Sequence, residues 1–280
     1  MAASEMFQKP AGAYERFVGR YGPSLAAAFA DFAGVTDGMR ALDVGCGPGP
    51  LTALLAGRLG AGRVSAAEPS EAFAAACRER VPGVEVVEAG AEELPFEDDR
   101  FDITLSQLVV NFIDEPVEGV REMARVTHPG GVVAACVWDY GGEMTLLRKF
   151  WDAAIEILPE RARVADEGVS MEWCGEGQLA GLWAAAGLDI VRSGDLLAQA
   201  EYANFEDLWS PLPTGVGPAG AFCASLDESE QKRLKRAFRR RLGVGEGPFE
   251  LTARAWAVVG KARRAPPPRT RSAARGKKKK

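Results

Sequence analysis

The sequence lacks several features that would place it in whole classes of proteins. No run of eighteen apolar residues occurs among its 280 residues, so no membrane-spanning segment is predicted. The first residues, MAASEMFQKP, contain no basic segment followed by an apolar one, so no secretory signal is expected. The five cysteines form no C-x-x-C pair, and we predict no metal site. These absences together predict a reduced, cytoplasmic protein.

The charge is unevenly distributed along the chain. The formal net charge is −5, but residues 262–280 contain five arginines, four lysines and no acid. The rest of the chain is therefore strongly acidic, which argues against a protein built around binding a phosphate backbone. The basic tail has no apolar periodicity and is predicted to be disordered. It could contact nucleic acid or an anionic membrane, although a solvated appendage is the favoured interpretation.

Apolar strands and amphipathic helices alternate through the first half of the chain. This pattern predicts an α/β fold, Rossmann-like, with a mostly parallel sheet and helices on both faces. An earlier helix is predicted to be capped by Ser24 and to end at Gly34. The alternating elements are strands at 41–44, 63–68, 84–88, 102–107 and 131–138, and helices at 50–59, 71–80 and 115–126.

The second half is less regular. Helices are predicted at 143–157, 177–186 and 227–242, and strands near 188–193 and at 249–260. The last strand alternates apolar and polar residues, which is compatible with antiparallel pairing. Between these elements, residues 202–222 are rich in aromatic residues, proline and glycine.

A glycine-rich turn follows the first predicted strand, in the segment LDVGCGPGP of residues 42–50. Glycines at such a turn permit positive φ and let a ligand approach the backbone. A phosphate-binding P-loop would need Gly-Lys-Ser/Thr, and a dinucleotide turn would place its third glycine one residue later. Asp43 would repel a pyrophosphate, whereas Glu68, after the second strand, suits ribose hydroxyls. The residues favour a positively charged nucleoside without phosphates, and S-adenosylmethionine has that composition.

Five segments in order strengthen this interpretation: LDVGCGPG, AAEPS, AGAEELPFEDDRFD, SQLVVNFIDEP and REMARVTHPGGVVAACVWDY. Together they resemble a class I S-adenosylmethionine-dependent methyltransferase, within the group that includes the ubiquinone/menaquinone-biosynthesis enzymes. The resemblance covers roughly residues 10–140 and implies a seven-stranded sheet. It also implies one domain over residues 1–261. Residues 36–140 would form its cofactor-binding core, and residues 141–247 would form substrate or lid insertions.

The resemblance assigns cofactor-binding roles to particular residues. Glu68 would bind the ribose, and adenine recognition would fall to backbone groups or to Glu92, because Gly90 replaces an aspartate that the family often has there. The other expected contacts are the methionine end with Asp43, Gly45, Cys46 and Gly47, the adenine with Pro69, Ser70 and Ala91, the sulfonium end with Ser106 and Gln107, and two covering aromatics, Tyr14 and Tyr21.

The acceptor and the catalytic base are less defined. Candidate bases or shape elements after the fourth and fifth strands are Asn111, Trp138, Asp139 and Tyr140. His128, the only histidine, is predicted to lie in a surface loop. Aromatic residues in the second half suit a small hydrophobic acceptor: Phe150, Trp151, Trp173, Phe205, Trp209 and Phe222.

Two other functions stay open. The same fold could act on RNA or protein, with the basic tail for docking. It could also bind S-adenosylmethionine without transferring a methyl group, because intact Asp43, Gly45, Gly47 and Glu68 indicate binding and do not indicate turnover.

Overall fold

In the computed structural model, which describes residues 16–263, seven strands form one sheet in the order β3-β2-β1-β4-β5-β7-β6. The strands β1 to β5 pair in parallel, and β7 runs antiparallel to both β5 and β6. This confirms the predicted mostly parallel, Rossmann-like sheet. The strands are β1 (Ala41–Val44), β2 (Val64–Ala67), β3 (Glu85–Val87), β4 (Phe101–Gln107), β5 (Thr127–Trp138), β6 (Asp189–Tyr202) and β7 (Phe249–Lys261).

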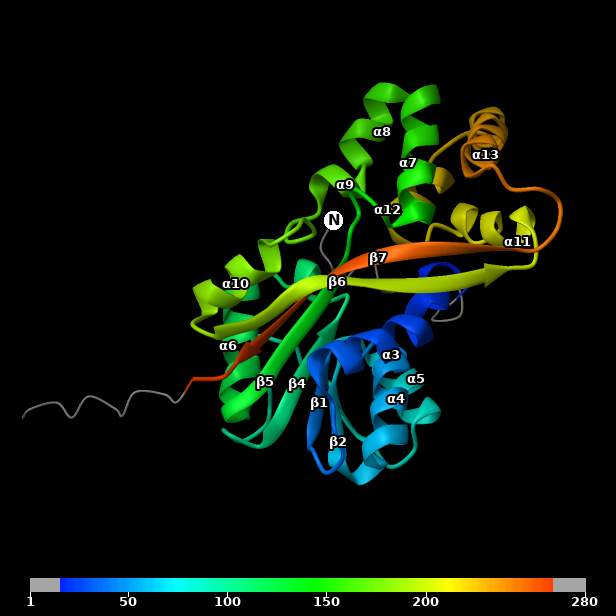
Figure 1. The fold of residues 1–280 in the computed structure, drawn as a ribbon. Coiled ribbons are helices and arrows are strands. Elements are labelled where there is room, and N and C mark those ends of the chain that lie inside the picture. The colour runs from blue at the N-terminus through cyan, green and yellow to red at the C-terminus, as the bar shows by residue number, and fades with distance from the viewer. Residues whose placement is uncertain (1–15, 264–280) are drawn as a thin grey trace, which may run out of the picture.

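Helices cover both faces of the sheet, as Figure 1 shows. On one face lie α3 (Gly22–Ala33), α4 (Pro50–Leu59) and α5 (Glu71–Arg80), and on the other lie α6 (Pro116–Val126) and α10 (Gln178–Ala186). Every residue of β1 and β2 is buried, as expected for strands between two helical layers. The carboxyl ends of β1, β2 and β4 therefore meet at one edge.

The start of α3 differs from its prediction. The helix begins at Gly22, after a short 3-10 helix, η1 (Val18–Tyr21), so Ser24 lies inside it and is not its cap. The Ser24 hydroxyl instead accepts the backbone N–H of Gln199 in β6 at 3.0 Å. It therefore holds α3 against the outer strand of the sheet. Gly34 does end the helix, in the left-handed conformation.

The strand β6 is much longer than the predicted 188–193, because it continues to Tyr202. In its second half, alternate residues are buried, from Leu196 to Tyr202, and they pair with β7 in register, Leu196 opposite Ala255. The strand β5 is also longer and begins at Thr127. His128 therefore lies in a strand, partly exposed, with Nε2 3.0 Å from Asp102 Oδ1.

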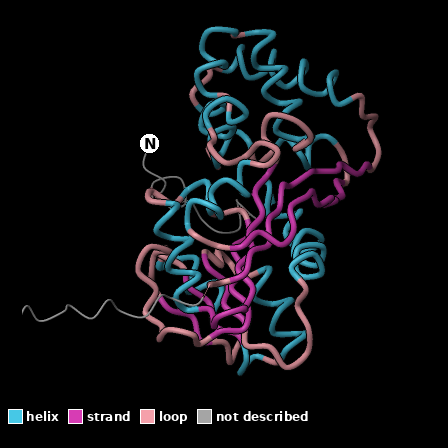
Figure 2. Tube along the Cα trace, turned by 60° about the vertical axis from the view of Figure 1, so that its left-hand side comes forward, coloured by secondary structure: helices cyan, strands magenta, loops and turns pink. Residues whose placement is uncertain are grey.

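A separate group of helices lies above the outer half of the β6–β7 ribbon (Figures 1 and 2). We call this group the helical layer. It consists of α7 (Thr145–Ile157), α8 (Pro159–Ala165), α9 (Glu167–Ser170), α11 (Phe205–Trp209), α12 (Gly217–Ala224) and α13 (Glu228–Leu242). Two of these helices, α7 and α13, are joined by an ion pair between Glu156 and Arg241 at 2.8 Å.

The helical layer has an aromatic core of its own. Phe150 packs edge-on against Trp151 and Phe238, with ring centroids 5.2 and 5.7 Å apart. Phe205 and Phe222 join the same cluster. Burying each such ring contributes about 1.5–3 kcal/mol. These aromatic residues thus stabilise the helical layer.

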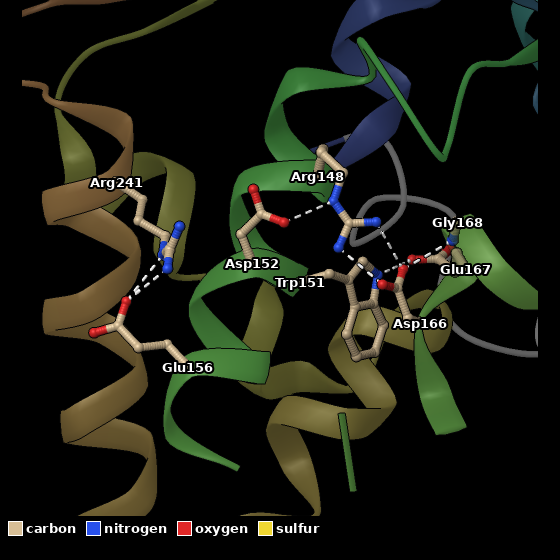
Figure 3. A network of polar contacts seen from close by, with 8 residues as sticks. All are labelled: Arg148, Trp151, Asp152, Glu156, Asp166, Glu167, Gly168 and Arg241. Atoms are coloured by element: carbon tan, nitrogen blue, oxygen red, sulfur yellow. Dashed lines mark hydrogen bonds and ion pairs between the residues drawn. The ribbon is translucent and has the colours of Figure 1, made fainter. Parts of the chain in front are cut away.

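A polar network joins α7 to α9 (Figure 3). The Arg148 guanidinium donates to both carboxylate oxygens of Asp166, at 3.1 and 2.8 Å, and its Nε donates to Asp152. Asp166 in turn caps α9 by accepting the N–H of Gly168. The neighbouring carboxylate, Glu167, is buried and accepts the Trp151 indole N–H at 2.9 Å. Burial raises the pKa of Glu167 to about 7.

Candidate functional site

A cavity of about 1190 Å³ lies at the carboxyl ends of β1, β2 and β4. Open α/β sheets bind their ligands at this edge. The cavity brings together most of the residues predicted for the cofactor: Asp43, Gly45, Cys46, Gly47, Glu68, Pro69, Ser70, Ala91, Glu92 and Gln107. Gly90 lies in the wall beside Ala91.

In the glycine turn, Gly45 leaves no room for a side chain. Gly45 has φ +73°, and a Cβ on it would lie 2.5 Å from both methyl carbons of Val109. The backbone N–H groups of Gly45 and Cys46 donate to the Ala67 carbonyl oxygen, at 2.8 and 3.1 Å. Gly47 has φ +53° with open space where a Cβ would stand. The turn is therefore fixed on one side and leaves bare backbone on the other.

Asp43, near the carboxyl end of β1, is a buried carboxylate that no cation compensates in the described part of the chain. Its Oδ2 accepts the Thr52 hydroxyl at 2.7 Å, whereas its Oδ1 is buried without a hydrogen-bond partner. Burial raises the pKa of Asp43 to about 7, the Thr52 bond lowers it and nearby Glu68 raises it. An unpartnered buried acceptor costs free energy, which a donor on a bound ligand would recover.

Glu68 joins the glycine turn at Gly47 to the loop at Ser70, and both line the cavity. Its Oε2 accepts the N–H of Gly47 at 2.9 Å, and its Oε1 accepts the N–H of Ser70 at 3.0 Å. Burial raises the pKa of this carboxyl, and the two backbone donors oppose the effect. Each oxygen keeps a second lone pair, so the carboxylate could still accept ribose hydroxyls.

At the end of β4, Ser106 and Gln107 were both predicted to contact the cofactor, but only Gln107 lines the cavity. Gln107 lines the cavity, and its Oε1 is buried without a hydrogen-bond partner. Ser106 is fully buried, donates to the Val44 carbonyl oxygen at 3.0 Å and is absent from the cavity wall. Side chains alternate along a strand, so only one of two neighbours can face the ligand.

Of the two predicted covering aromatics, only Tyr21 belongs to the described residues. Tyr14 lies outside the described residues. Tyr21 is fully buried, packs edge-on against Trp138 at 5.7 Å and does not line the cavity. Burial strongly raises the pKa of its phenol, which leaves it protonated.

None of the candidate bases lines the cavity in the described part of the chain. Trp138 and Tyr140 are buried. Asp139 is held by Arg254, whose Nε and Nη2 donate to its Oδ2 at 3.0 and 2.8 Å. Asn111 contacts Met171 through its Nδ2, and its Oδ1 is buried without a partner. These positions give no direct support to a base among them.

Two residues that shape the cavity, Arg20 and Thr52, were not predicted from the sequence. Arg20, in η1, lines the cavity and donates to both oxygens of Asp207 in α11. Thr52 holds Asp43 from the first turn of α4. No sequence signal marks either contact, because each depends on how separate elements pack. The apolar part of the wall includes Val18, Leu51, Leu54, Leu108, Val109, Phe112 and Ile113.

Residues 16–263 also show neither a metal site nor a membrane span. No group of three or more histidine, cysteine, aspartate or glutamate side chains there is placed to hold a metal ion. Nor does any helix there have the length and apolarity that crossing a membrane requires.

Comparison with known proteins agrees with this geometry. Residues 42–135 match the family described as "Methyltransferase domain". A demethylmenaquinone methyltransferase of Clavibacter sepedonicus is 30% identical over 200 residues, which cover 67% of this chain and 77% of that protein. An uncharacterized protein of Mycobacterium tuberculosis is 30% identical over 223 residues, 76% of this chain and 79% of that protein.

Solved structures share the fold at low sequence identity. A SAM-dependent methyltransferase of Thermotoga maritima has a TM-score of 0.54 and 19% identity, covering 92% of this chain and 99% of that one. The [4+2]-cyclase SpnF also has a TM-score of 0.54 and 19% identity, covering 86% of this chain and 80% of that one.

The glycine turn, the two buried acids and these relatives define the class of protein. The chain belongs to the class I methyltransferases. It is an S-adenosylmethionine-dependent methyltransferase, and S-adenosylmethionine is its cofactor.

Proposed function

We propose that this enzyme transfers the methyl group of S-adenosylmethionine to a small, apolar acceptor. The observation that carries the proposal is the composition of one cavity wall. Unpaired acceptor oxygens of Asp43 and Gln107 lie in the same cavity as the apolar side chains of Leu108, Val109 and Phe112. The quinone-type acceptor named for the Clavibacter relative supports the same class of substrate.

The residues present fit the cofactor. Asp43 and Gln107 would accept hydrogen bonds from its ammonium group, and Glu68 would accept its ribose hydroxyls. Gly90, Ala91 and Glu92 would lie along the adenine edge. When bound, the cofactor supplies an electrophilic methyl group on a sulfonium.

The protein's part is to orient and to exclude water. The turn at Gly45 is pinned to β2, so the methionine end of the site is rigid. The apolar wall keeps water from the acceptor and holds it near the cofactor, which lowers the entropic barrier to transfer. None of the candidate bases lines the cavity within residues 16–263, which favours an acceptor that ionises on its own.

Calorimetric titration tests the cofactor site. S-adenosylmethionine and S-adenosylhomocysteine should bind, and NAD should not. Glu68→Gln should weaken binding by about 10-fold or more, because a charged acceptor of hydrogen bonds is lost. Glu79→Ala is the matched control, because Glu79 is exposed on α5 and does not line the cavity. Binding of NAD alone would contradict the proposal.

Transfer of labelled methyl groups tests the acceptor. Naphthoquinols and phenols should be methylated, and carboxylate-bearing analogues of the same size less so, because acids predominate over arginines in the cavity wall. The tail that would dock RNA or protein lies largely outside the described residues. Truncation after Arg263 should leave turnover of the small acceptor unchanged. Labelling of RNA or protein in place of small molecules would contradict the proposal.

A further inference from the structure

The side chain of Thr52 holds the buried acid of the cavity in place. Thr52 is the third residue of α4 and is fully buried. Its hydroxyl donates to Asp43 Oδ2 at 2.7 Å, across the glycine turn that separates the two residues. A threonine inside a helix often bonds to the carbonyl oxygen four residues earlier. Here the donor is directed to a carboxylate at the edge of the cavity instead.

The contact leaves the two carboxylate oxygens of Asp43 in different states. Oδ2 has the Thr52 donor, and Oδ1 has none within the described part of the chain. Asp43 lines the cavity, and Oδ1 is the carboxylate oxygen that has no hydrogen bond and so keeps its full acceptor capacity for a ligand. The hydroxyl bond also fixes the side chain, which would otherwise rotate about χ2.

The surroundings otherwise oppose ionisation of Asp43. The titratable groups that face it are the carboxyl of Glu68 and the thiols of Cys46, Cys77 and Cys136, and none of them is cationic. The donors that favour its charged form come from Thr52, through the hydroxyl and the backbone N–H. A cationic ligand binds best to a carboxylate that is already ionised and aimed at it.

We propose that Thr52 is a positioning residue for the cofactor, which holds the Asp43 carboxylate through Oδ2 and leaves its Oδ1 for the cationic end of the ligand. The inference rests on the proposed cofactor site. It assigns a role to a residue that touches the cofactor only through Asp43.

Thr52→Val tests the role, because valine has the same shape and no donor. The affinity for S-adenosylmethionine at pH 7.5 should fall about 10-fold, the usual effect of removing a hydrogen bond to a charged group. The pH below which affinity is lost should rise by about one unit. Thr52→Ser should restore both, because it keeps the hydroxyl.

The control is Thr104→Val. Thr104 is equally buried, in β4, and its hydroxyl pairs with Thr127 at 2.6 Å, away from the cavity. It should lose a similar amount of stability in urea denaturation and keep its affinity. An effect of Thr104→Val on affinity equal to that of Thr52→Val would overturn the assignment.

A second readout needs no cofactor. The carboxyl carbon of Asp43 can be titrated by NMR in the free protein, and its pKa should be higher in Thr52→Val than in wild type. An unchanged pKa would overturn the inference. Failure of the wild type to bind S-adenosylmethionine would instead contradict the proposed cofactor site. The NMR titration would still show whether the Thr52 hydroxyl lowers the pKa of Asp43.

Discussion

Gly45 has two independent reasons to be glycine, its φ of +73° and the Val109 methyl groups 2.5 Å from where a Cβ would stand. Gly45→Ala should therefore destabilise the protein by about 2–4 kcal/mol, from strain and overpacking together. It should also abolish cofactor binding, because the turn must shift. Urea denaturation and calorimetry measure the two effects.

The same chain offers a matched glycine. Gly57 is exposed in α4, with ordinary helical φ and nothing within 4 Å of a Cβ. Gly57→Ala should stabilise the protein by about 0.5–1 kcal/mol. In the double variant Gly45→Ala/Val109→Ala, part of the lost stability should return. No recovery there would show that backbone strain, and not Val109, dominates.

For single residues, the sequence predicts a position that depends on neighbouring residues. It does not predict a position that depends on a contact with a distant residue. Asp43 lies near the carboxyl end of β1 and Glu68 directly follows β2, so their place in the cavity could be predicted from strand ends alone. Tyr21 could not be placed in the same way. Its burial depends on Trp138, more than a hundred residues away, and no local pattern reports that contact.

At the scale of elements, one side chain joins a wall of the cavity to the rest of the protein. Arg20 in η1 donates to Asp207 Oδ2 at 2.8 Å and to the Glu201 carbonyl oxygen at 3.2 Å. Its guanidinium also lies over the Tyr202 ring, 5.0 Å from the centroid. The contact therefore ties η1 to both β6 and α11.

We predict that Arg20→Ala mainly affects binding. The ion pair is partly exposed, so its loss should cost only about 1 kcal/mol of stability. Loosening η1 should weaken cofactor binding several-fold, because Val18 and Gly19 line the cavity. Arg58→Ala is the control, since Arg58 pairs with Asp31 on exposed surfaces of α4 and α3. Equal binding by Arg20→Ala and wild type would show that η1 does not depend on this pair.

Helices and strands could be predicted where each element packs against its neighbours in the sequence. The five parallel strands and their helices follow from short apolar segments between amphipathic ones. The outer half of β6 could not, because its buried positions alternate with polar ones and include small residues, Ala198 and Ala200. That half is a strand because β7 pairs with it along its length, a contact made about fifty residues later.

For the whole molecule, the sequence pattern distinguishes the regular first half from the irregular second half. It does not predict whether the aromatic residues of the second half form a core or a substrate pocket. The aromatic residues after position 140 suit a hydrophobic acceptor by composition, and Phe150, Trp151 and Phe222 pack on one another in the helical layer. Hydrophobicity alone does not distinguish a core from a pocket, because both bury apolar surface. The role of residues 141–247 as a lid stays a prediction.

The protein carries buried acids in both of its parts, and this makes its stability depend on pH. Asp43 lies in the sheet and Glu167 in the helical layer, and burial raises the pKa of each to about 7. The folded state therefore binds these protons more tightly than the unfolded chain, whose carboxyls titrate near pH 4. Their neutral forms favour folding fully below pH 4. That contribution is lost as the pH rises from about 4 to about 7.

We accordingly expect the free energy of unfolding of the cofactor-free protein to fall between pH 5 and pH 8. The loss should be on the order of 3 kcal/mol per carboxyl. Asp43→Asn keeps an acceptor for Thr52, and Glu167→Gln keeps one for Trp151, so each should flatten the profile without leaving its donor unpaired. Urea denaturation at several pH values measures the slope. Saturating S-adenosylmethionine should remove the Asp43 part and leave the Glu167 part, because a cationic ligand favours the ionised carboxylate only in the cavity. A stability that rises over this range would show that the two acids are ionised and paired in the folded protein.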